Sequence, residues 1–303
     1  MQNIEIADAS IARELDANGY VVVPGADAAT VTGLCRDIYD EIRFACRDKV
    51  NYNTGADVTG PIRGLAFERI TTAFAPVLDR YFRAHDCIVG LMFVKRPTAM
   101  PAGHIHLHCD PTLLPDENRQ RHLNVWAPLV DVDETNGALW VVPRSHTAFA
   151  PVHAFSVPSQ FAQIRDTVVK HGTCEPMKAG DMLIFDNRMP HFSRPNLGEA
   201  DRPAAVLSIV PSGSEFISLF GAANGEFPIE VFRQPRSWYE DMDWTNDRDR
   251  PQRGELLGRL KWVPRMLSRD EFIERIETRT APPYRFELLA PAAIRDHEPS
   301  RPA

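Results

Sequence analysis

The sequence predicts an all-β core with flanking helices. Over residues 88–211, short runs of β-branched and aromatic residues are separated by turn residues, a pattern typical of a β-sandwich or barrel. These runs do not alternate with helical segments, which argues against a doubly wound parallel sheet. With 303 residues and 44% hydrophobic content, the chain is long enough for one large core. We therefore expect a single domain over 1–303, with an N-terminal helical part (1–87), a β core (88–211) and a C-terminal extension (212–303).

The N-terminal part is expected to contain three helices and one short strand. Apolar residues recur at helical spacing over three ranges, 8–18, 27–48 and 66–86. Gly19 suits the C-terminus of the first helix, and the apolar run Tyr20–Val23 predicts a strand. Residues 50–64 are polar and rich in glycine, so they predict a loop.

The β core is expected to contain seven strands. They are the apolar runs 88–95, 103–110, 122–132, 138–142, 172–177, 181–186 and 204–210.

The C-terminal extension has a mixed pattern. Residues 233–256 are rich in charge, Pro and Trp and indicate no element. Ser268 and Glu271 form a capping box, which predicts a helix over 269–278, with Leu267 packing on Phe272. We expect the residues after about position 290 to be frayed.

Charge and cysteine content limit the classes of protein to which the chain can belong. The net charge is −7, which argues against nucleic acid as a partner because nucleic-acid binders carry a basic surface. The five cysteines lack C-x-x-C spacing, which argues against a disulfide framework or a structural zinc site. We expect reduced, apolar-packed thiols in a cytoplasmic protein. The sequence shows no membrane span and no signal peptide.

The residues that indicate chemistry are His108, Asp110 and His191. Residues i and i+2 of a strand point to the same face, so His108 and Asp110 can reach one metal ion, and Cys109 cannot join them. His191 is well placed in the sequence to supply a third ligand. Two imidazoles and one carboxylate leave coordination positions open, as in non-haem Fe(II) oxygenases.

Two other interpretations of this stretch are open. His106 with His108 forms an H-x-H pair as in cupin-type sites, which also need a carboxylate a few residues later. The next carboxylate is Asp116, which lies beyond two prolines, and this spacing is poor. An H-x-D pair is also common by chance, with side chains that only satisfy the hydrogen bonds of their neighbours.

The downstream residues favour a functional site. Gly180 and Asp181 mark a turn before an apolar strand, and Ser193 lies two residues beyond His191. Arg202 opens the next strand. A guanidinium in this place can bind a carboxylate through two parallel hydrogen bonds.

These residues resemble the phytanoyl-CoA dioxygenase family of Fe(II)- and 2-oxoglutarate-dependent oxygenases. The resemblance runs from about residue 10 to residue 210. It includes an opening helix–GYVVV–PG–helix pattern, the HCD motif, NVWAPLVDVDETNGALWVVPRSH, and GDMLIF…H-x-S-x-x-N…R. It implies a double-stranded β-helix, or jelly roll, flanked by N-terminal helices.

The resemblance also implies a role for each matching residue. Three residues match the iron ligands: His108, Asp110 and His191. Arg202 matches the residue that binds the distal carboxylate of 2-oxoglutarate, and Ser193 and Trp126 match positions in the same cosubstrate pocket. Asn124 shares a strand face with Trp126 and is a further candidate.

Three positions depart from the family pattern without touching the three ligands. Cys109 stands where Gln is common, Arg144 replaces the Gly of a PGSH turn, and Phe192 replaces a Gly that often follows the distal His. A phytanoyl thioester therefore does not follow as the substrate.

The resemblance implies oxidation, most simply hydroxylation, of a small organic molecule with Fe(II), 2-oxoglutarate and O2. We expect a secondary metabolite or an amino-acid-like compound. A zinc hydrolase on the same ligands is one alternative, although Arg202 and Ser193 would then lack a cosubstrate. A non-catalytic jelly roll that binds a small molecule is another, and the retained ligands argue against it. A homodimer is compatible with the sequence.

Several other features have simpler explanations. We expect His146 to be a structural hydrogen-bonding residue, His122 to be a strand-face residue, and the Trp and Tyr residues at 238–244 to pack together. Residues 50–64 and 111–121 are candidate lids, and 146–171 is a candidate further wall. Residues 212–290 are expected to cover the barrel mouth or to form a dimer interface.

Overall fold

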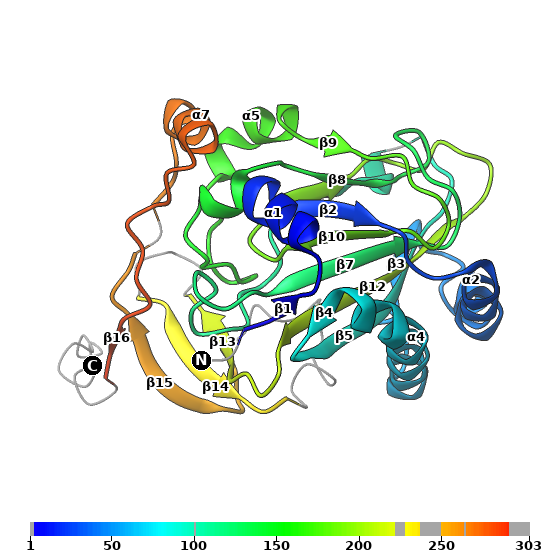
Figure 1. Ribbon diagram of the computed structural model, residues 1–303, viewed down its shortest axis with the longest axis horizontal. Coiled ribbons are helices and arrows are strands. Elements are labelled where there is room, and N and C mark those ends of the chain that lie inside the picture. The colour runs from blue at the N-terminus through cyan, green and yellow to red at the C-terminus, as the bar shows by residue number, and fades with distance from the viewer. Residues whose placement is uncertain (1–2, 100, 222–227, 237–249, 264, 291–303) are drawn as a thin grey trace, which may run out of the picture.

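A computed structural model describes residues 3–99, 101–221, 228–236, 250–263 and 265–290. Two antiparallel sheets form its core (Figure 1). The first has six strands in the order β2-β10-β7-β12-β5-β3, and the second has four in the order β6-β11-β8-β9. This architecture confirms the predicted all-β core and the jelly-roll fold.

The strands of the six-stranded sheet are β2 (Tyr20–Val23), β3 (Asn51–Asn53), β5 (His85–Lys95), β7 (Leu123–Pro128), β10 (Met182–Asp186) and β12 (Arg202–Pro211). Those of the four-stranded sheet are β6 (Ile105–His108), β8 (Leu139–Val141), β9 (Thr173–Cys174) and β11 (His191–Ser193). Five of the seven predicted core strands are shorter than the sequence predicts, β5 and β12 are longer, and β11 was not predicted as a strand.

The N-terminal helices cover one face of the six-stranded sheet (Figure 1). They are α1 (Ala9–Asn18), α2 (Ala28–Leu34), a π-helical segment (Cys35–Tyr39), α3 (Asp40–Ala45) and α4 (Gly60–Tyr81). Alternation along β12 explains the packing, because Ala205 and Leu207 join the helices in one hydrophobic core, whereas Val206 and Ser208 face a cavity on the opposite side. The helices therefore leave the other face of the sheet free for a site.

The first helix ends as the sequence predicts. Gly19 has a φ of 82°, a left-handed conformation that closes α1 by donating its N–H to the carbonyl of Leu15. A Cβ atom at this position would collide with the ring of His146.

Two N-terminal predictions are wrong. Residues 50–64 are not a loop, because β3 pairs with β5 and α4 already begins at Gly60. Pro61 suits the first turn of a helix, where its missing N–H is not needed. The helix predicted to reach residue 86 ends at Tyr81, because β4 (Phe82–Arg83) pairs with β1 (Glu5–Ile6).

The C-terminal extension contains a four-stranded antiparallel sheet that the sequence did not predict. Its strands are β13 (Phe216–Phe220), β14 (Glu230–Gln234), β15 (Glu255–Leu260) and β16 (Leu288–Leu289). Phe216 packs with Leu113 and Val210 of the core region. The helix α7 (Arg269–Thr278) was predicted, and its N-cap Ser268 accepts a hydrogen bond from the N–H of Glu271 at 3.2 Å.

Within the described residues, no helix is both long and apolar enough to cross a membrane. The predicted packing cluster at 238–244 and the predicted fraying past residue 290 lie outside the described residues.

Candidate metal and cosubstrate site

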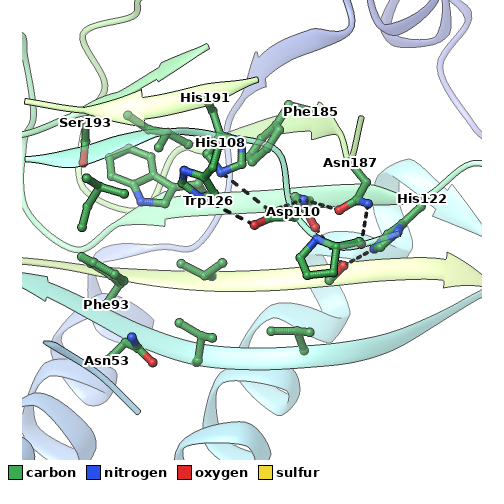
Figure 2. A pocket seen from close by; sticks show the side chains of 18 of the residues that line it. Asn53, Phe93, His108, Asp110, His122, Trp126, Phe185, Asn187, His191 and Ser193 are labelled. Carbon is green, nitrogen blue, oxygen red and sulfur yellow. Dashed lines mark hydrogen bonds and ion pairs between the residues drawn. The ribbon is translucent and has the colours of Figure 1, made fainter. Parts of the chain in front are cut away.

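A cavity of about 220 Å³ lies between the two sheets. Its walls come from β5, β7, β10 and β12 of the six-stranded sheet and from β6, β8 and β11 of the other. Figure 2 shows Ser193 and Phe93 toward one end of the cavity and His122 and Asn187 toward the other. Asn53, Pro111 and Leu113 also line it, so both predicted lid segments contribute to its wall. The lining residues include none from 146–171 or 212–290 of the described chain.

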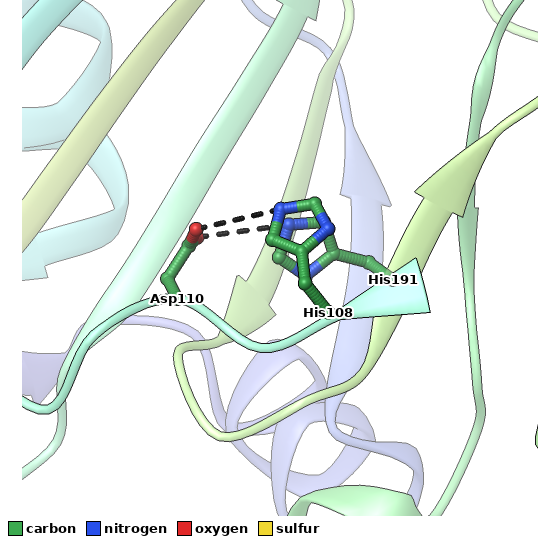
Figure 3. A group of neighbouring side chains, drawn as sticks. All are labelled: His108, Asp110 and His191. Atoms are coloured by element: carbon green, nitrogen blue, oxygen red, sulfur yellow. Dashed lines mark ion pairs between the residues drawn. The ribbon is translucent and has the colours of Figure 1, made fainter. Parts of the chain in front are cut away.

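The three predicted ligands meet at this cavity (Figure 3). His108 ends β6 and His191 begins β11, and the two are paired across neighbouring strands with ring centroids 4.2 Å apart. Asp110 lies just beyond the end of β6, with carboxylate oxygens 3.8 Å from His108 Nε2 and 3.7 Å from His191 Nε2. One ligand atom of each residue lies within 4.8 Å of the others.

Backbone hydrogen bonds orient both imidazoles for metal binding. The Nδ1–H of His108 donates to the carbonyl of His106 at 2.7 Å, and that of His191 donates to Met189 at 3.0 Å. These bonds place the proton on Nδ1 and leave the Nε2 lone pair free. Burial and the adjacent His191 lower the pKa of His108 to about 4, which keeps its ring neutral at neutral pH. The donor set and its tautomers fit a divalent ion such as Fe(II).

The alternative ligand pair is not formed. His106 is exposed and its ring stacks with His104 at a centroid distance of 6.5 Å. Asp116 pairs with Arg119. Cys109 belongs to a hydrophobic cluster and its thiol approaches the Arg188 carbonyl at 3.5 Å, with burial raising its pKa. The thiol is therefore separated from the metal site, as the strand alternation predicts.

Arg202 provides a buried anion site in the same cavity. Its side chain is only 2% exposed, and neither Nε nor Nη1 has a hydrogen-bond partner within the part of the chain that the structure describes. The guanidinium lies 5.3 Å from the ring centroid of Trp126 and 5.9 Å from that of Phe93. Burial lowers the pKa of Arg202 to about 9, a measure of how poorly its charge is compensated. Buried donors without partners are costly, so the site is built for an anion.

Asn124 contacts the metal site directly. Its Nδ2 donates to Asp110 Oδ2 at 2.8 Å and to Asn187 Oδ1 at 3.0 Å, and its Oδ1 accepts from Ser208 at 2.8 Å. The sequence suggested Asn124 as a cosubstrate residue. The structure places its amide on the carboxylate of Asp110.

A buried polar network continues from Asn124. His122 Nε2 lies 2.6 Å from Ser208 Oγ, and His122 Nδ1–H donates to Glu117 at 3.0 Å. Glu117 is 3% exposed and also accepts from Asn187 and from the backbone of Leu113. His122 was predicted to lie on a strand face; it stands one residue before β7 and lines the cavity, outside the group of three ligand residues. Glu117 and Ser208 were missed, although Ser208 faces Asn124 in the β7–β12 register.

Lys95 was also missed. It has no exposed surface and donates to Ser193 Oγ at 2.8 Å. It lies opposite Arg202 in the β5–β12 register. The signal available in the sequence was the alternation that puts Lys95 on the same face as Phe93.

His146 is buried, and burial lowers its pKa. It lies outside the cavity, beside the α1 terminus at Gly19. The cysteines are all free, and Cys46 is buried. His146 Nδ1 has no hydrogen-bond partner among the described residues, so its predicted hydrogen-bonding role stays a prediction, and the other four cysteines are half-buried.

The phytanoyl-CoA dioxygenase (PhyH) family model matches residues 15–204, more than half of the chain. The chain belongs to the phytanoyl-CoA dioxygenase family. The enzymes of this family use Fe(II), 2-oxoglutarate and O2, and at the level of the family this confirms the expected cofactors.

One curated relative is phytanoyl-CoA dioxygenase domain-containing protein 1 of Danio rerio. It is 26% identical over 117 residues, which cover 36% of this chain and 40% of the relative. The match therefore spans about two fifths of that relative's length.

Two similar solved structures are described as proteins of nogalamycin biosynthesis. The non-haem α-ketoglutarate-dependent carbocyclase SnoK gives a TM-score of 0.51 at 20% identity, covering 69% of this chain and 86% of its own. The epimerase SnoN, in complex with Fe3+, α-ketoglutarate and nogalamycin RO, gives a TM-score of 0.52 at 18% identity. The match covers 82% of this chain and 94% of SnoN. At these identities the likeness supports the fold.

Proposed function

We propose that the protein is an Fe(II)- and 2-oxoglutarate-dependent oxygenase that hydroxylates, or otherwise oxidises, a small organic molecule. One observation carries the proposal: the three ligand side chains line the same cavity as Arg202, a buried guanidinium with unpaired donors. A metal site beside a carboxylate site is what a 2-oxo acid that chelates iron requires.

The metal and the cosubstrate are bound by different residues of the cavity. Nε2 of His108, Nε2 of His191 and the Asp110 carboxylate hold Fe(II), and Arg202 binds the distal carboxylate of 2-oxoglutarate. When both are bound, Fe(II) would supply the activation of O2 that oxidises the substrate, and 2-oxoglutarate would be converted to succinate and CO2.

The rest of the cavity binds the substrate and excludes water. Val89, Leu91 and Leu113 give it apolar walls. Trp126 and Phe93 flank the guanidinium and limit its access to solvent. Excluding water strengthens the contact between Arg202 and a carboxylate, because charges interact more strongly where the effective dielectric constant is low.

We propose a secondary metabolite, or an amino-acid-like compound, as the substrate. The apolar walls suit a carbon skeleton. SnoK is a carbocyclase from nogalamycin biosynthesis and SnoN was crystallised with nogalamycin RO, and from them we extend only the broad class of substrate. That residues 1–303 act as one domain, and that the protein forms a homodimer, stay predictions.

Succinate release tests the proposal. Protein, 2-oxoglutarate and O2 are combined with a panel of amino acids and secondary metabolites, with Fe(II) or Zn(II). We expect succinate only with iron, raised by at least one panel member and abolished in Asp110→Ala. Asp116→Ala, which changes a carboxylate of the 111–121 segment, is the matched control and should retain succinate formation. Hydrolysis of a panel member with zinc would favour the hydrolase, and failure to bind 2-oxoglutarate would overturn the assignment.

A further inference from the structure

Lys95 is a buried lysine whose charge is not balanced by any carboxylate of the described residues. It continues the inward face of β5 that carries Leu91 and Phe93, and it has no exposed surface. Its Nζ has three acceptors: Ser193 Oγ at 2.8 Å, the Arg194 carbonyl at 2.5 Å and the Ser193 carbonyl at 3.4 Å. The charge that acts on it is that of another cation, Arg202, which opposes its protonation.

Two buried cations side by side are unfavourable unless an anion joins them. Lys95 and Arg202 face each other across the β5–β12 register. Each loses hydration on burial, and they repel one another. Burial and Arg202 together lower the pKa of Lys95 to about 7, in agreement with this geometry. An anion bound at Arg202 would compensate both charges.

The hydrogen-bond chemistry of Lys95 fixes the direction of the Ser193 hydroxyl. A protonated lysine has three donors and no acceptor. Because Lys95 donates to Ser193 Oγ, the hydroxyl must accept this bond, and its own proton is free to point elsewhere. Ser193 and Arg202 both line the cavity. The free O–H of Ser193 and the unpaired Nε and Nη1 of Arg202 are then three donors available to one carboxylate.

We propose that Lys95 is a positioning residue of the cosubstrate subsite, which holds Ser193 as a hydrogen-bond donor toward the distal carboxylate of 2-oxoglutarate and adds a second buried positive charge there. This inference rests on the proposed function. Lys95 itself does not touch the cosubstrate, because its donors are already occupied by Ser193 and the Arg194 carbonyl.

The test is a binding measurement on the Fe(II)-loaded protein without O2. Lys95→Met should weaken 2-oxoglutarate binding by roughly ten-fold or more, the scale expected for a charge-assisted contact. Binding of 2-oxobutyrate, which lacks the distal carboxylate, should change by no more than about two-fold. Lys178→Met, which removes an exposed lysine, is the matched control and should change neither.

A double-mutant cycle tests the route through Ser193. If Lys95 acts by orienting this hydroxyl, Lys95→Met combined with Ser193→Ala should lose little more affinity than the more harmful single variant. Fully additive losses would overturn the inference, as would a Lys95→Met variant with unchanged 2-oxoglutarate affinity. If Lys95→Met does not fold, Lys95→Gln replaces it, because its amide can still donate to the Arg194 carbonyl without a charge. The same loss of affinity is expected, and an unchanged affinity would again overturn the inference.

The outcomes separate this inference from the proposed function. If the wild-type protein with iron does not bind 2-oxoglutarate, the proposed function fails. If wild type binds it and Arg202→Ala weakens binding while Lys95→Met does not, only the role of Lys95 is wrong.

Discussion

At Lys95 and Arg202 the chain places two positive charges side by side in the protein interior. Burial and the charge of Arg202 both oppose protonation of Lys95, so its pKa falls to about 7, and the lysine still holds its proton below that pH. The charged group that acts on Lys95 is Arg202 of β12. Lys95 acts in turn on His104, just before β6, whose pKa is lowered mainly by burial, so that His104 is neutral above pH 7. Among the described residues Lys95 is thus the group of this subsite that titrates near neutral pH.

This predicts a pH dependence of cosubstrate binding. A bound carboxylate favours protonated Lys95 and raises its pKa, so above about pH 7 binding takes up a proton. Affinity for 2-oxoglutarate should be highest at or below pH 7 and should fall by up to about ten-fold per unit as pH rises further. Calorimetric titrations from pH 6.5 to 9 on a Mn(II)-loaded protein would measure it. A flat profile in the wild type, or the same slope in Lys95→Met, would contradict this.

A single residue, Asp110, is also expected to decide whether the substrate is hydroxylated or halogenated. Its carboxylate lies 3.8 Å and 3.7 Å from the Nε2 atoms of His108 and His191, where it would fill a coordination position of the bound metal with a negative charge. A second anion such as chloride is therefore disfavoured, and we expect oxygen-based oxidation without native halogenation. Asp110→Gly should abolish hydroxylation without creating an efficient halogenase, because a halide must also be stabilised by the groups that surround the metal ligands. Mass spectrometry of products formed with chloride present decides this, and a chlorinated wild-type product would exclude Asp110 as a ligand.

At the scale of elements, the inward face of β7 supports the metal site. Its side chains alternate, so that Leu123 and Val125 join the helical core while Asn124 reaches Asp110. Ser208 of the neighbouring strand β12 orients the amide of Asn124 by donating a hydrogen bond to its Oδ1. A hydrogen bond of this kind fixes the orientation of a metal-ligating carboxylate.

Removing this support should weaken metal binding. Asn124→Ala is expected to lower Fe(II) or Co(II) affinity by about ten- to a hundred-fold, because Asp110 loses its orienting donor. Competition with a metal-binding dye measures the affinity. Asn118→Ala, which changes an exposed amide, serves as the control. Equal affinities for Asn124→Ala and wild type would show that Asp110 is held in place by other contacts.

The sequence predicted those elements whose signal is local. Strand alternation indicated that His108 and Asp110 share a site, and the capping box at Ser268 indicated α7. His191 was assigned to the same site through the family resemblance, not through a local signal. The short pair β3–β5 was not predictable, because Asn51 and Asn53 are polar and become a strand only by pairing with the distant edge of β5. Tertiary pairing overrides local propensity at such an edge.

The polar network and Lys95 escaped prediction for a related reason. Glu117 and His122 are close in sequence, yet their meaning depends on Ser208, which the β7–β12 register brings to them. Lys95 has no signature of its own, and its importance appears only when Arg202 lies opposite. Both the polar network and the Lys95–Arg202 pair depend on the register between strands that are distant in the chain, which a single sequence does not specify.

At the scale of the whole molecule, the C-terminal extension is packed onto the core. Phe272 of α7 is fully buried and stacks with Phe149 at a centroid distance of 5.8 Å. Ile217 and Val231 of the C-terminal sheet share a hydrophobic cluster with Val152. The extension therefore stabilises the segment near 148–161, and none of its described residues lines the cavity.

Truncating this contact should cost stability and leave the site intact. Phe272→Ala is expected to lower the free energy of unfolding by about 3–5 kcal/mol, through lost burial and the resulting cavity. Urea denaturation measures the change. Phe44→Ala, which removes an exposed phenylalanine, should cost far less. A loss under about 1 kcal/mol for Phe272→Ala would mean that α7 is not part of the cooperative core.

The central claim is that one cavity holds iron and 2-oxoglutarate together. Anaerobic titration of the Fe(II)-loaded protein with 2-oxoglutarate tests it, because chelation of iron by the 2-oxo acid produces a visible charge-transfer band. We predict a saturable band in the wild type and none in His191→Ala. In Arg202→Ala, we predict the same band with roughly ten- to a hundred-fold weaker affinity and iron binding unchanged. The absence of any band in iron-loaded wild-type protein, or an Arg202→Ala titration identical to wild type, would contradict the account.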